Sequence, residues 1–136
     1  MQRLVDFIKS VLGICETKLL DQELWSIEQS NVVRVKLSQM PEPCQKGGGV
    51  YLKGQGLHKP ILLVRTEDDQ YLAFTNRCTH WGHRKLDPVP GQRILRCCSI
   101  GRSTFDYEGK KISGPAKDPL TRSEVELSEG DLLVKL

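Results

Sequence analysis

The chain has 136 residues, of which 38% are hydrophobic and 27% charged, and a formal net charge of +3. This composition is typical of one soluble globular domain and excludes a disordered chain. Twenty basic residues are scattered along the sequence and nearly balanced by seventeen acidic ones, so no nucleic-acid partner is expected. No stretch approaches the roughly 20 apolar residues of a membrane span. We therefore expect an untargeted cytoplasmic protein.

The N-terminal residues predict one amphipathic helix over 3–20. Apolar side chains recur there at helical spacing, at Leu4, Val5, Ile8, Val11, Leu12 and Cys15. We expect this helix to pack on the sheet or on a partner. The predicted organisation is therefore a helix and linker over residues 1–30, followed by one domain over residues 31–136.

From residue 31 onward the apolar residues alternate with polar ones, which is typical of strands. A first strand is predicted around Val33 to Leu37, and an irregular segment over 38–60 holds a short strand at Val50 to Leu52. Further strands are predicted at 61–64, 71–74, 94–97, 104–106, 111–112, 125–127 and 132–136, separated by turn residues. Many short strands at close spacing predict an all-β sandwich or small barrel.

The cysteines and histidines predict a metal site rather than a disulfide framework. They are Cys15, Cys44, Cys78, Cys97, Cys98, His58, His80 and His83. In a reducing compartment such clusters bind metal more often than they form disulfides. Cys78 and His80 are two residues apart and precede Gly82, which lets the backbone bend tightly. Their side chains can therefore point to one side of a turn and clip a metal ion.

The segment CTHWG at 78–82, followed by CSIGRSTFD at 98–106, resembles the two-part signature of the Rieske [2Fe-2S] family. Downstream, Gly114-Pro115-Ala116 is similar to the proline-loop segment of that family. The resemblance extends over about residues 31–136. It implies an antiparallel β-sandwich with two cluster-binding loops, 78–86 and 97–104, which face each other at one end of the domain. The N-terminal helix would be an addition to this fold.

In that family two cysteines bind one iron and two histidines bind the other. By position, the resemblance assigns Cys78 and Cys98 to the first iron and His80 to the second. The second histidine should lie three residues after Cys98, where this chain has Gly101. A frame that starts at Cys97 supplies no histidine either. One of the four expected ligands is therefore missing.

Three other residues near the motif have expected roles. His83 is a possible replacement ligand, or alternatively an exposed loop residue. Ser103 matches a family position whose hydroxyl group hydrogen-bonds a cluster sulfide. Cys97 is expected to pack inside the domain, because adjacent strand residues point to opposite faces. No role is assigned to Cys44 or His58.

The resemblance predicts a small ferredoxin-like electron-transfer protein with an altered ligand set around a [2Fe-2S] cluster. Its partner would be a redox protein such as a reductase or an oxygenase. No catalytic residues are expected, so the chain would be a non-catalytic component of an oxidoreductase system. Two alternatives stay open: a clusterless domain with a regulatory or assembly role, and a mononuclear zinc or iron site built from Cys78, His80, Cys98 and one further group. The oligomeric state is not predicted.

Overall fold

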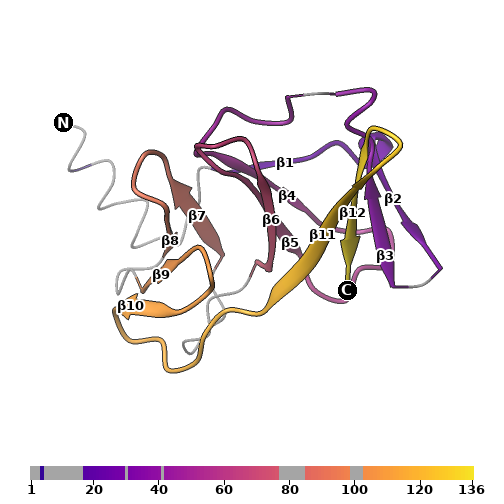
Figure 1. Ribbon diagram of the computed structural model, residues 1–136. Helices are drawn as coiled ribbons and strands as arrows, with labels where there is room; N and C mark the ends of the chain where they lie inside the picture. The colour runs from indigo at the N-terminus through magenta and orange to yellow at the C-terminus, as the bar shows by residue number, and fades with distance from the viewer. Residues whose placement is uncertain (1–3, 5–16, 30, 41, 77–84, 99–102) are drawn as a thin grey trace.

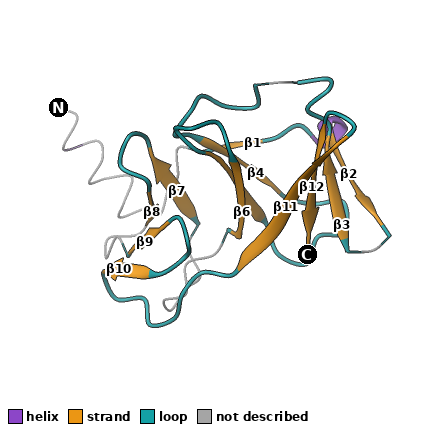
Figure 2. Cartoon of the chain, in the orientation of Figure 1, coloured by secondary structure: helices purple, strands orange, loops and turns teal. Residues whose placement is uncertain are grey.

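The computed structural model describes Leu4 and residues 17–29, 31–40, 42–76, 85–98 and 103–136. Within these residues the chain forms two β-sheets and one short 3-10 helix (Figures 1 and 2). The predicted all-β fold is therefore confirmed. No helix in the described part of the chain is long and apolar enough to cross a membrane.

The larger sheet has eight strands in the order β1-β4-β5-β6-β11-β12-β3-β2. Only β1 and β4 pair in parallel, and the other neighbours are antiparallel. A 3-10 helix, η1 (Gln22–Leu24), precedes β2. The strands are β1 (Lys18–Leu19), β2 (Trp25–Glu28), β3 (Val32–Val35), β4 (Gly49–Leu52), β5 (Ile61–Arg65), β6 (Tyr71–Thr75), β11 (Arg122–Ser128) and β12 (Asp131–Lys135).

The smaller sheet has four antiparallel strands in the order β10-β9-β8-β7. They are β7 (Leu86–Val89), β8 (Ile94–Cys97), β9 (Thr104–Asp106) and β10 (Lys111–Ser113). All four lie between β6 and β11 in the chain, so the small sheet is an excursion from the large one (Figure 1). The excursion leaves and returns at adjacent points, because Thr75 N donates a hydrogen bond of 2.9 Å to Thr121 O.

Strand β5 separates two hydrophobic clusters. Leu63 faces the first cluster, which is formed by side chains of the large sheet and includes Trp25 and Val33. Leu62 and Val64 face the second, which fills the space between the two sheets. The second cluster also contains Phe74, Leu86, Leu95, Cys97 and Phe105. Burial on both faces explains why β5 is a continuous apolar run rather than an alternating one.

The predicted helix over 3–20 is wrong at its C-terminal end, where residues 18 and 19 form β1. Leu20 N donates to Tyr51 O at 2.8 Å, which extends the pairing of β1 with β4. Lys18 and Leu19 are both exposed, Leu19 to 48%, whereas Leu20 is buried. Before Thr17 only Leu4 is described, and its side chain is exposed. The rest of the predicted helix, including Ile8, Val11 and Leu12, lies outside the described residues.

Two further strands were not predicted from the sequence. Strand β2 is short and carries Trp25, which lies in the first cluster. Strand β7 contains Pro88, a residue that argues against a central strand but is tolerated at a sheet edge, and β7 is such an edge. Strands β1 and β2 are the outermost strands of the large sheet, so residues 17–28 extend it at both edges. The predicted division of the chain at residue 30 stays a prediction.

Candidate metal centre

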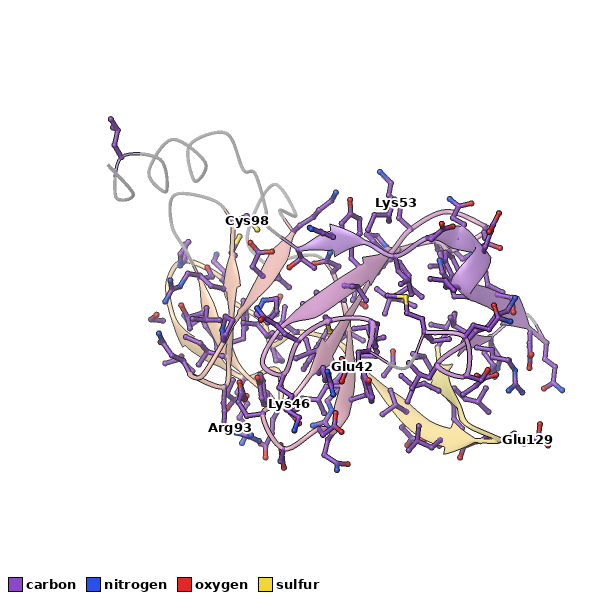
Figure 3. The ribbon with its side chains drawn as sticks, turned by 90° about the horizontal axis from the view of Figure 1, so that it is seen from above. Glu42, Lys46, Lys53, Arg93, Cys98 and Glu129 are labelled. Carbon is purple, nitrogen blue, oxygen red and sulfur yellow. The ribbon has the colours of Figure 1, made fainter. Side chains whose placement is uncertain are left out.

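The two connections that carry the predicted ligands start and end at the same end of the small sheet. Leu86 pairs with Cys97 in the register of β7 and β8, and Cys98 N donates to Lys85 O at 3.0 Å. The end of the first connection therefore lies against the start of the second, and the rest of the two loops that were predicted to face each other lies outside the described residues. Figure 3 shows Cys98 at this end of the small sheet and Arg93 at the opposite end. The predicted ligands Cys78 and His80, with His83 and Gly101, lie outside the described residues.

Asn76 closes the base of the first connection. It follows β6 directly, and its side-chain Oδ1 accepts a hydrogen bond of 2.9 Å from Leu86 N. Its backbone N donates to Pro60 O at 2.8 Å. The side chain is buried, and its Nδ2 has no hydrogen-bond partner among the described residues. The start and end of the connection are thus held together by one carboxamide.

Ser103 closes the second connection. Its carbonyl accepts a 2.8 Å hydrogen bond from Cys97 N, and its fully buried Oγ accepts a 2.9 Å bond from Ala116 N. Among the described residues this is the only hydrogen bond of the hydroxyl group. Gly114 packs directly on Ser103: a Cβ added to Gly114 would lie 2.4 Å from Ser103 Cα. Only glycine allows this approach.

The two adjacent cysteines of the motif have different surroundings. Cys97 is 1% exposed and belongs to the hydrophobic cluster between the sheets, so the prediction that it packs inside is confirmed. Cys98 begins the second connection, is 8% exposed, and takes part in a disulfide. A thiolate at Cys98 is therefore available to a metal only after reduction.

The remaining cysteine and histidine of the described residues lie in the segment before β5. Cys44 lines a cavity of about 560 Å³ together with Thr17 and Asp87. Burial raises the pKa of its thiol, although the nearby Arg65 opposes this. His58 is exposed. No group of three His, Cys, Asp or Glu side chains among the described residues could hold a metal ion.

A polar cluster that sequence reasoning missed lies at the other end of the small sheet. The Tyr107 hydroxyl donates to Glu67 Oε1 at 3.0 Å, and Gly91 N donates to Glu67 Oε2 at 3.1 Å. The Arg93 guanidinium lies 4.9 Å from the centre of the Tyr107 ring and 3.3 Å from Asp68. The cluster joins the β5–β6 turn to the small sheet. Its only sequence signal was the acidic turn itself.

Hydrogen bonding in this cluster shifts two pKa values in opposite directions. Burial alone raises the pKa of Glu67, but the bonds from Gly91 and Tyr107 outweigh it, so the pKa lies below its usual value. Burial, followed by the hydrogen bond to Glu67 and the charge of its carboxylate, raises the pKa of Tyr107 to about 12. The pair is therefore a neutral phenol that donates to an ionised carboxylate.

With this geometry in place, comparison with known proteins identifies the family. The family model described as the Rieske [2Fe-2S] domain matches residues 32–126. This chain belongs to the Rieske [2Fe-2S] domain family. The match covers both connections and every strand of the small sheet. The predicted membership of the Rieske family is thereby confirmed.

Relatives of this Rieske domain differ widely in size. The chain is 36% identical over 75 residues to the carotenoid phi-ring synthase of Chlorobaculum tepidum, a match that covers 55% of this chain and 11% of that protein. The solved plasma membrane Rieske protein PetC3 from Synechocystis PCC 6803 is 23% identical, with a TM-score of 0.53 over 68% of this chain and 100% of PetC3. The ferredoxin of carbazole 1,9a-dioxygenase from Nocardioides aromaticivorans IC177 is 18% identical, with a TM-score of 0.54 over 73% and 90% of the two chains. At these identities the solved structures show a common fold.

Proposed function

We propose that this protein is a small Rieske-type electron-transfer protein that binds a [2Fe-2S] cluster through Cys78, Cys98 and His80. The observation that carries the proposal is the Ser103 hydroxyl. Its oxygen is fully buried and accepts from Ala116 N, and no described residue accepts a hydrogen bond from its proton. A sulfide of the bound group would supply such an acceptor.

Cys78, Cys98 and His80 would supply three of the four protein ligands of a Rieske cluster. Two cysteine thiolates and one imidazole are ligand types that the family uses. The fourth position, at Gly101, has no side chain, so another group must complete it. We assign this role to His83, which lies three residues after His80 in the same connection. Water is the competing ligand, and the variants below separate the two.

The position of the site suits electron exchange with another protein. A bound cluster would supply the redox chemistry, and Cys98 would attach it at one end of the small sheet. The similarity in fold to a dioxygenase ferredoxin supports a reductase or an oxygenase as the partner. The chain would then be a non-catalytic component of an oxidoreductase system.

One observation favours a second candidate function. Cys98 takes part in a disulfide, and the family's second histidine is absent from the second connection. A Rieske fold in which Cys98 is oxidised would bind no cluster through that residue. It would act through its surface, as a regulatory or assembly subunit of an oxidoreductase.

Metal analysis of reduced, anaerobically reconstituted protein tests the proposal. We expect two irons and two sulfides per chain, with visible absorption from the cluster. Cys98→Ser should abolish iron binding, while Cys97→Ser should retain it because Cys97 is buried between the sheets. Loss of iron in His83→Ala would identify the replacement ligand. Retention of iron would leave water as the fourth ligand, and Gly101→His should then strengthen cluster binding.

Two other results would contradict the proposal. Colourless protein without metal after reduction and reconstitution would support the clusterless candidate. Colourless protein with one zinc per chain would support a mononuclear site built on Cys78, His80 and Cys98.

A further inference from the structure

Two side-chain nitrogens are buried without a hydrogen-bond partner in the described part of the chain: Trp25 Nε1 and Asn76 Nδ2. Buried polar groups are normally paired, so each exception needs an explanation. Trp25 lies on β2 within the first hydrophobic cluster, among apolar side chains. Asn76 lies at the base of the connection that carries Cys78 and His80. Trp25 Nε1 is therefore surrounded by apolar side chains, whereas Asn76 Nδ2 lies at the base of the connection that carries the predicted ligands.

The carboxamide of Asn76 is fixed in orientation by its other hydrogen bond. Leu86 N is a donor, so the carboxamide atom that faces it at 2.9 Å must be the oxygen. The NH₂ group then occupies the other arm of the planar amide. The backbone bond to Pro60 O further limits movement of the residue. Nδ2 is thus a preorganised donor that lacks an acceptor among the described residues.

We infer that Asn76 is a positioning residue of the metal centre, whose Nδ2 donates a hydrogen bond to a sulfur atom of the bound centre while its Oδ1 ties the first connection to β7. This inference rests on the proposed function, because a sulfur atom of the metal centre can accept this hydrogen bond only in the metal-bound protein. Cys78 lies two residues further along the chain, which makes its thiolate the nearest candidate in sequence. Hydrogen bonds to cluster sulfurs stabilise the more negative, reduced state and raise the reduction potential.

The test compares Asn76→Asp, Asn76→Ala and the control Trp25→Phe in reduced, reconstituted protein. Asn76→Asp keeps an oxygen for Leu86 N but removes the donor and adds a negative charge. Asn76→Ala removes the whole carboxamide without adding charge. Trp25→Phe removes the other unpaired donor, in the cluster that does not face the small sheet. Iron and sulfide content, the electron paramagnetic resonance spectrum of the reduced protein and the midpoint potential are measured for each.

We expect both Asn76 variants to bind iron and to have a lower midpoint potential and an altered spectrum, while Trp25→Phe matches the parent. A shift in Asn76→Asp alone would be a charge effect and would overturn the inference. A shift in Asn76→Ala alone would mean that the residue acts only as a tie to Leu86, which also overturns it. If the parent binds iron and all three variants match it, the inference fails and the proposed function stands. A parent that takes up no cluster overturns both.

Discussion

Gly114 passes so close to Ser103 that a Cβ on the glycine would lie 2.4 Å from Ser103 Cα and 2.9 Å from its backbone nitrogen. Gly114 also has a φ of +97°, a backbone conformation that residues with a side chain rarely adopt. We expect Gly114→Ala to lower the free energy of unfolding by about 2–4 kcal/mol, from backbone strain together with the steric overlap. Urea unfolding of the metal-free protein measures this loss.

Gly130→Ala is the matched control for this substitution. Gly130 has a φ of +82°, but a Cβ there would meet nothing within 4 Å. Its replacement should cost about 1 kcal/mol, from strain alone. Equal losses in the two variants would show that contact with Ser103 does not matter.

Replacing Ser103 tests the hydroxyl group itself. Ser103→Ala leaves the buried Ala116 N–H without its acceptor, so we expect the free energy of unfolding to fall by about 1–3 kcal/mol. In iron-loaded protein the midpoint potential should also fall, because a donor to sulfur is lost. Ser113→Ala, at an exposed position on β10, should stay within about 0.5 kcal/mol of the parent. An unchanged potential in Ser103→Ala would contradict the proposed donor role.

We expect the folded protein to lose stability at alkaline pH because Tyr107 becomes deprotonated. Burial and the hydrogen bond to Glu67 raise its pKa from 10.0 to about 12 in the folded protein. A raised pKa means that the folded state holds the proton more tightly. The stabilisation is therefore complete below pH 10 and is lost as the pH rises toward about 12.

Urea unfolding of the parent and Tyr107→Phe as a function of pH measures this contribution. The stability advantage of the parent should shrink between pH 10 and about 12. A constant difference across this range would show that deprotonation of Tyr107 is not linked to folding.

Thr17 ties the N-terminal strand of the large sheet to the small sheet. Its backbone N donates to Asp87 Oδ1 at 2.9 Å, and its hydroxyl donates to the same oxygen. We expect Thr17→Val, which keeps the shape but removes the hydroxyl bond, to cost about 0.5–1.5 kcal/mol. Thermal unfolding measures the loss. Thr121→Val provides a comparison, and a larger loss there would argue against an important role for Thr17.

Strands whose own side chains alternate were predictable from the sequence. Strands β8 and β9 have the predicted bounds, and Val33 and Val35 face the core as expected. Strand β1 was not predictable, because its two residues depend on pairing with β4, about thirty positions away. Local apolar spacing suggested a helix there, and long-range pairing prevailed.

The sequence motif located the two connections of the candidate site, but not the groups that support them. The pairing of Lys85 with Cys98 agrees with the expected meeting of the two connections. The carboxamide of Asn76 and the contact of Gly114 with Ser103 involve distances and orientations that no spacing rule supplies. The bond between Glu67 and Tyr107 joins residues forty positions apart, so local patterns gave no signal for it.

The small sheet leaves the large one after Thr75 and returns at Thr121, two residues joined by a 2.9 Å hydrogen bond. Strands β6 and β11 are neighbours in the eight-stranded sheet, so a short connection between Thr75 and Thr121 would keep this sheet continuous. The strands of the small sheet are therefore an insertion: removing them would leave the order of the eight strands unchanged, but it would expose Leu62, Val64 and Phe74 to solvent.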